Sequence, residues 1–271
     1  ISSGEKTSKM QSVKSGINRY NDGMGLREMW LKKYFTTYET FFDNDNHGLN
    51  PRYQIPPFTN WIREAGILNL SDKSISPIGK RMADAFADNA ETVWEIIWVN
   101  LTENSEIAKW FYSTVPYARN VTKQELELMI QDSYPDLKDR TLKNPLNSLL
   151  NTFKESPLGN AVAVPTTVDR KPGVIRKPYN DLSLVATAYS LYRYAEKNCR
   201  YSLTVSEFYN PDQTEGIVRQ FGIEREDFEA ILRSLEQEQN QVLRAELKMG
   251  LDNIILREDL TSEDIIKLML K

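Results

Sequence analysis

Residues 137–154 carry the kinds of side chain that proteins use to contact DNA. Positive and amide groups follow one another closely: Arg140, Lys143, Asn144, Asn147 and Lys154. Arginine and lysine bind backbone phosphates, and asparagine can pair with the edge of an adenine in the major groove. The segment therefore predicts a helix that binds double-stranded DNA.

Pro145 lies in the middle of this segment and bears on where the helix begins. Inside a helix, proline removes a backbone hydrogen bond at a cost of about 3 kcal/mol, whereas it is well tolerated at the first helical position. Asparagine is a favoured N-cap, so we expect Asn144 to cap a helix that begins at Pro145. Arg140 and Lys143 would then lie in the preceding turn, near the helix end whose dipole suits a phosphate. A short helix could instead serve only the core, since it carries an apolar face: Leu142, Leu146, Leu149, Leu150 and Phe153.

A second basic segment, 169–181, follows a strand-like run at 161–168. Four of its residues are positively charged: Arg170, Lys171, Arg176 and Lys177. It contains two prolines, and its composition is typical of a loop. It is either a basic wing that contacts DNA beside the helix or an exposed connector.

Residues of the kinds used in catalysis are scarce. The chain has one cysteine, Cys199, and one histidine, His47. These counts exclude the common zinc and iron–sulfur sites built within one chain. No glycine-rich phosphate loop in the right context is present. We therefore expect no catalytic residue, metal or cofactor here, a solvated loop position for His47, and a buried position for Cys199.

The elements that must position these residues recur along the chain in a similar order. Apolar residues at spacings of three and four predict helices, and residues on either side of Gly250 predict a hairpin. The fold class we expect is mainly α with short β-hairpins, in tandem winged-helix-like units. The predicted divisions are a flexible arm or linker at 1–24, and units at 25–117, 118–180 and 181–271. The five tryptophans lie on helical apolar stripes and are expected in the core.

The charge distribution favours the second unit as a nucleic-acid binder. The net charge of the chain is −4, so it is not a general polyanion binder. The segment from Glu224 to Glu246 contains seven acidic residues and only three arginines. The third unit is therefore the poorer candidate for binding a nucleic acid. No apolar run is long enough to cross a membrane, and the single cysteine fits a reducing, cytoplasmic location.

The segments LREMWLKK, TNWIREAGIL, ETVWEIIWVNL and RTLKNPLNSLLNTF follow one another along the chain. Their order resembles that of the domain of unknown function 4007 family of bacterial proteins. That family begins with a GHETFxLRxxWLKK motif, of which this chain keeps LREMWLKK at 26–33 but not the His-Glu-Thr-Phe part. Segments that resemble family blocks follow in the same order, among them TNWIREAGIL, ETVWEIIWVNL, KWFYSTVP, RTLKNPLNSLLNTF and EREDFEAILRSLE. The resemblance covers residues 25–271.

The resemblance implies an accessory protein of DNA modification or phage defence. Family members are often encoded beside phosphoadenosine-phosphosulfate (PAPS) reductase-like and DNA-phosphorothioation-type genes. We therefore expect a non-catalytic module that binds DNA and is fused to, or partnered with, a PAPS-reductase-like sulfur-transfer protein. The alternatives are a protein-interaction scaffold without DNA binding and a C-terminal part of a PAPS-reductase-like enzyme.

Overall fold

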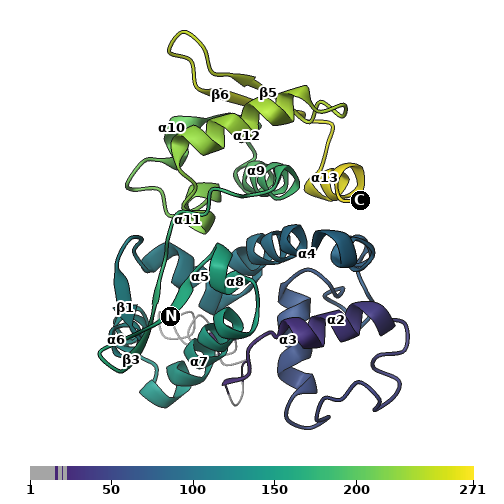
Figure 1. Cartoon of the computed structure of the whole chain (residues 1–271), viewed down its shortest axis with the longest axis vertical. Helices are drawn as coiled ribbons and strands as arrows, with labels where there is room; N and C mark the ends of the chain where they lie inside the picture. The colour runs from purple at the N-terminus through teal and green to yellow at the C-terminus, as the bar shows by residue number, and fades with distance from the viewer. Residues whose placement is uncertain (1–15, 18–19, 21–22) are drawn as a thin grey trace, which may run out of the picture.

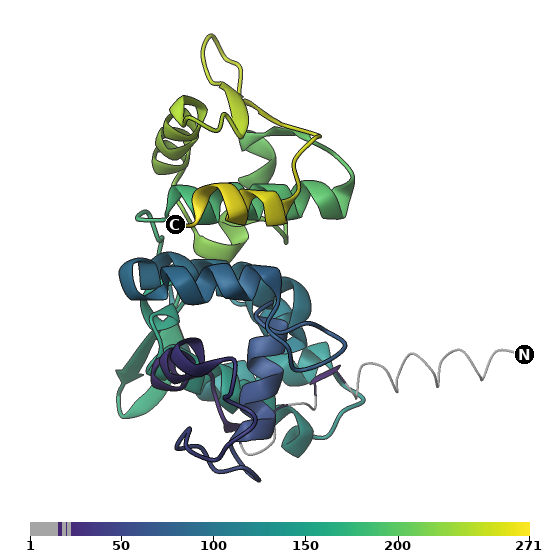
Figure 2. The ribbon, with the colours of Figure 1, turned by 90° about the vertical axis from the view of Figure 1, so that its right-hand side faces the viewer.

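The computed structural model describes residues 16–17, 20 and 23–271, and α4 (Pro77–Asn104) divides it in two. This long helix crosses the middle of the molecule, with the first two units on one side and the third unit on the other (Figures 1 and 2). The described chain is mainly helical and has two small antiparallel sheets, which confirms the predicted mainly α class with short β-hairpins.

The first unit is built around α4. It contains α2 (Glu28–Thr37), α3 (Ile55–Glu64), α4 and α5 (Glu106–Thr114). Ser76 caps α4 by accepting the backbone N–H of Gly79, and Pro77 occupies the first turn. Asn89 has non-helical angles, so α4 is two helices joined at a kink.

The second unit contains the segment that the sequence singles out. Its elements are β1 (Asn120–Thr122), α6 (Lys123–Ser133), α7 (Asp139–Glu155), α8 (Leu158–Ala161), β2 (Val164–Val168) and β3 (Lys171–Ile175). The strands are antiparallel in the order β1–β3–β2. At the start of α6, Thr122 and Glu125 bond each other's backbone N–H groups as a capping box, as their spacing predicts.

The third unit repeats this order of elements, with an additional helix before its first strand and another after its last. It contains α9 (Leu184–Asn198), β4 (Ser202–Thr204), α10 (Val205–Phe208), α11 (Ile217–Phe221), α12 (Arg225–Gln237), β5 (Leu243–Glu246), β6 (Asn253–Leu256) and α13 (Ser262–Met269). Its antiparallel strands follow the order β4–β6–β5, so the last strand is again the central one. The hairpin predicted around Gly250 is the β5–β6 pair.

A connector at 176–183, buried at Arg176 and Leu182, joins the second and third units. The Tyr179 backbone N–H donates to the Phe221 carbonyl (3.0 Å). The Tyr179 hydroxyl and the Ser183 N–H both donate to the carboxylate of Glu95 on α4 (3.2 and 3.1 Å). Burial raises the pKa of Glu95 above its usual range. The connector is therefore fixed to α4 and α11 by its own backbone and side chains.

The core takes in the five tryptophans and part of the predicted arm. All five tryptophans are buried, as their helical spacing predicts. Ile17 and Tyr20 are also fully buried, and Tyr20 stacks on Trp61 at 4.6 Å and forms a hydrogen bond with Ser105 at 2.8 Å. The arm predicted at 1–24 therefore includes core residues, and its remaining positions up to 22, apart from Gly16, lie outside the described residues.

Two single residues differ from expectation. His47 is not solvated: its side chain is buried, stacks against Phe41 at 4.9 Å and accepts the Leu49 N–H through Nδ1 (3.1 Å). Cys199 is exposed rather than buried, because it ends α9 in a left-handed conformation with φ of 51°. None of the helices in the described chain has the length and apolarity that a membrane span requires.

Candidate nucleic-acid interface

Helix α7 begins earlier than the sequence predicts. Its N-cap is Lys138 and its first residue is Asp139, so Pro145 lies inside the helix and Asn144 is not a cap. The prediction of a start at Pro145 is wrong because Leu142 must be buried on the same face as Leu146 and Phe153. Burying a leucine contributes about 1.5–3 kcal/mol, which offsets much of the cost of the interior proline. Arg140 and Lys143 therefore project from the helix itself.

The outer face of α7 forms a continuous polar stripe without a carboxylate. Arg140, Asn144, Asn147, Asn151 and Lys154 follow one another at spacings of four, three, four and three, which keeps them on one side of a helix. Arg140, Asn144 and Lys154 are exposed, and the two central asparagines are half-buried. Lys143 is exposed beside the stripe. The sequence reasoning missed Asn151, although its distance of four residues from Asn147 could have revealed it.

The basic segment 169–181 divides into two parts, a hairpin up to Ile175 and a connector after it. Asp169 and Arg170 form the two-residue turn between β2 and β3, with φ of 50° and 63°. Positive φ at both positions is the type I′ geometry that tight hairpins prefer. Arg170 and Lys171 are exposed at the tip, and Lys177 is exposed in the connector. The segment thus contains both a hairpin and a connector, the two alternatives that the sequence leaves open.

Arg176 does not face solvent, which corrects its assignment to a basic wing. Its side chain is fully buried. The guanidinium donates to the carbonyls of Tyr112 (3.1 Å), Val115 (3.0 Å) and Arg219 (2.6 Å) and to the Tyr117 hydroxyl (2.7 Å), and its carbon lies 4.0 Å from the Tyr117 ring centroid. Burial lowers the pKa of Arg176 to about 10. The carbonyls belong to the ends of α5 and α11, where helix dipoles favour a cation.

A hollow of about 250 Å³ separates α7 from the β2–β3 hairpin. Polar groups reach it from two helices: Lys123 from the start of α6, and Asn147, Asn151 and Lys154 from α7. The hairpin side consists of Pro165, Pro172, Gly173 and Val174. The hollow thus joins the two parts that the sequence predicts to act together.

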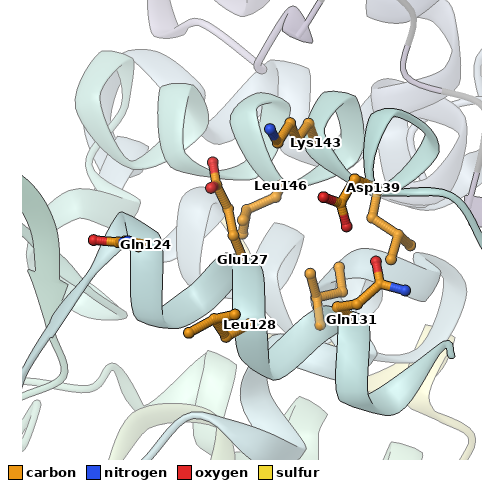
Figure 3. A pocket seen from close by; sticks show the side chains of 9 residues that line it. Gln124, Glu127, Leu128, Gln131, Asp139, Lys143 and Leu146 are labelled. Atoms are coloured by element: carbon orange, nitrogen blue, oxygen red, sulfur yellow. The ribbon is translucent and has the colours of Figure 1, made fainter.

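A second hollow, of about 180 Å³, lies on the other side of α7, against α6. Figure 3 shows Glu127 of α6 and Asp139 of α7 pointing into it, with Lys143 at its rim. Over the part of the chain that the structure describes, no three His, Cys, Asp or Glu residues gather so as to hold a metal ion. Two carboxylates in this hollow make it a poor seat for an anion.

The pairing of positive side chains distinguishes the second unit from the third. In the third unit, Arg225 and Arg233 both pair with Glu229 (3.3 and 3.7 Å), and Arg244 pairs with Glu246 (3.4 Å). On α7 and the hairpin tip, by contrast, the exposed cations form no ion pair with any carboxylate among residues 16–17, 20 and 23–271: Arg140, Lys143, Lys154, Arg170 and Lys171. The positive charge of α7 and the hairpin tip is therefore available to a ligand.

Comparison with known proteins supports the fold at low sequence identity. No protein-family profile matches the chain, and no curated protein does. Among solved structures, the chain is similar to a magnesium ion-bound SspB, with a TM-score of 0.67 and 13% identity, covering 94% of this chain and 88% of that one. It is also similar to a second SspB structure, with a TM-score of 0.66 and 14% identity over 93% and 87% of the two chains. The likeness extends over nearly the whole chain and concerns the arrangement of elements.

Proposed function

We propose that this chain is a non-catalytic module that binds double-stranded DNA through its second unit. The second and third units share the order strand, helix, helix, helix, strand, strand, with the last strand in the centre of the sheet. That order is the reason to regard them as winged-helix-like units, with α7 as the recognition helix and the β2–β3 hairpin as the wing. In helix-turn-helix proteins the recognition helix enters the major groove, which is wide enough for one helix.

The observation that carries the proposal is the carboxylate-free stripe of α7, exposed at Arg140, Asn144 and Lys154, beside an unpaired basic hairpin tip. Arg140, Lys143 and Lys154 would bind phosphates, and Asn144 and Asn147 are of the type that reads adenine. The wing contribution comes from Arg170 and Lys171, with Lys177 near its root. Arg176 is left out because it is buried among carbonyl groups.

The resemblance to the domain of unknown function 4007 family supports a setting for this binding. We propose that the module serves a bacterial DNA-modification or phage-defence system in the cytoplasm, with a PAPS-reductase-like or other sulfur-transfer protein as its partner. One of the structural neighbours holds magnesium. The hollow between α6 and α7 contains two carboxylates, those of Glu127 and Asp139. Magnesium sites in proteins usually combine one or two carboxylates with water molecules and substrate phosphates.

The test is DNA binding measured by fluorescence anisotropy with labelled duplexes over a range of salt concentrations. Reversing Arg140 and Lys143 to Glu together should lower affinity by about 10- to 100-fold near 0.1 M salt, since each lost phosphate contact reduces the salt slope by about 0.9. The matched control reverses Arg233 and Arg244, which are exposed in the third unit but already paired. Affinity of the Arg140 and Lys143 variant equal to that of the wild type at low salt contradicts the proposal.

The third unit favours a second candidate function, the protein-interaction scaffold. Its α12 exposes Glu226 and Glu236, and Met249 at the tip of the β5–β6 hairpin is fully exposed. Acidic helices repel DNA, whereas an apolar tip suits a protein partner. A sulfur-transfer partner that co-purifies with the chain, together with no affinity for any duplex, would favour the scaffold over the DNA-binding module.

A further inference from the structure

The hollow between α7 and the hairpin has a lining suited to an anion. Lys123 and Lys154 approach it from α6 and α7, and no carboxylate lines it. Lys123 forms no ion pair with a carboxylate in the described part of the chain. Two positive groups without a local counter-charge raise the concentration of anions around them. The chemical class that fits is therefore an anion held by two lysines.

The remaining walls favour an anion carried on an apolar or uncharged frame. Leu150, Val174 and the rings of Pro165 and Pro172 supply apolar surface. Gly173 keeps the hairpin close to β1, because a Cβ there would lie 2.5 Å from the Val121 carbonyl oxygen. A DNA backbone presents both features, since each phosphate is flanked by a largely apolar deoxyribose.

The position of Asn151 is fixed by the chain that precedes α2. Its Nδ2 donates to the Gly23 carbonyl (2.7 Å), and the Leu26 N–H donates to the Thr152 hydroxyl (2.8 Å). A Cβ at Gly25 would lie 2.4 Å from the Thr152 backbone nitrogen, so this segment lies directly on α7. One wall of the hollow is thus held rigidly, and Asn151 is a positioning residue.

From this geometry we infer that the hollow seats one phosphate of the bound DNA strand, gripped by Lys123 and Lys154. The inference rests on the proposed function and adds Lys123, which lies outside both basic segments of the sequence. A phosphate held between α7 and the hairpin fixes the register of the helix along the groove but reads no base. Loss of either lysine should therefore weaken binding equally on all sequences.

The experiment compares two duplexes of unrelated sequence, using the full chain and the variants Lys123→Ala, Lys154→Ala and the double variant. Each single change should lower affinity by about 5- to 10-fold near 0.1 M salt and reduce the salt slope by about 0.9, and the double change should reduce it by about 1.8. Both duplexes should respond alike. Lys80→Ala is the matched control, because Lys80 is an exposed lysine on α4 that does not line the hollow.

The outcomes separate this inference from the proposed function. If the Arg140 and Lys143 reversal weakens binding while Lys123→Ala leaves affinity and slope unchanged, the phosphate seat is wrong and the DNA-binding module stands. A loss confined to one duplex also overturns the inference, since it would mean base reading. If the wild-type chain binds neither duplex, both the proposed function and the proposed phosphate site are wrong.

Discussion

Replacing Arg176 with methionine should destabilise the protein without removing a DNA contact. Methionine fills much of the same volume with apolar atoms but donates no hydrogen bond. The change leaves the carbonyls of Tyr112 and Val115 without the donor they have in the wild type. The Arg219 carbonyl keeps a partner, because the Tyr117 hydroxyl also donates to it (2.9 Å).

The expected loss of unfolding free energy follows from these contacts. Two buried carbonyls left without a partner cost about 1–3 kcal/mol each, which gives about 2–6 kcal/mol. Removing the buried guanidinium also relieves its desolvation cost, so the net effect falls in the lower half of that range, about 2–4 kcal/mol. Arg176 has no carboxylate partner in the described structure, so no opposite charge is left behind.

Urea unfolding followed by tryptophan fluorescence measures this loss, because all five tryptophans are buried. The matched control is Lys177→Met at the exposed neighbouring position, which should change the unfolding free energy by less than about 0.5 kcal/mol. Anisotropy on a labelled duplex is measured in parallel. If Arg176→Met leaves the unfolding free energy unchanged but abolishes salt-dependent DNA affinity, the reasoning is refuted. Arg176 would then be a residue that contacts DNA.

Two further predictions concern a buried carboxylate and a helix cap. Burial raises the pKa of Glu95 in the folded protein above its value in the unfolded chain. Between these two pKa values the folded protein holds a proton that the unfolded chain has released, so the stability of the wild type falls as the pH rises from the lower value to the higher one. The stability of Glu95→Gln relative to wild type should therefore increase from about pH 5 to about pH 8 in urea unfolding, and an opposite trend would contradict the assigned burial effect. Thr122→Ala should lower the unfolding free energy by about 1 kcal/mol, because Thr122 accepts the Glu125 N–H at 3.2 Å in the capping box; no measurable change in the urea midpoint would argue against that cap.

The sequence predicts elements better than it predicts exposure. The apolar spacing of Leu142, Leu146, Leu149 and Phe153 correctly indicates the buried face of α7, because this pattern is local. The predicted start of α7 is wrong because the prediction relied on the preference of asparagine for the N-cap. Tertiary packing, which buries Leu142, extends the helix back to Asp139. The short helices α8 and α11 were not predicted, since neither is long enough to show a period.

The candidate site was only partly visible in the sequence for a similar reason. Arg176 lies in a basic, proline-containing run that is typical of an exposed loop. Its carbonyl partners at Tyr112, Val115 and Arg219 lie far away along the chain, so burial could not be read from the neighbouring residues. Lys123 directly follows the N-cap Thr122 in the sequence, but its place in the same hollow as Lys154 depends on the fold.

The burial of Arg176 also limits how the proposed DNA-binding surface can be moved into another protein. A fragment cut at residues 118 and 180 keeps α7 and the hairpin, yet it lacks α5 and α11, whose carbonyls hold Arg176. In such a fragment the root of the hairpin would lose its attachment, and the guanidinium would meet water instead of two helix ends. A graft that preserves the surface therefore has to carry the chain from Glu106 to Phe221 as one piece.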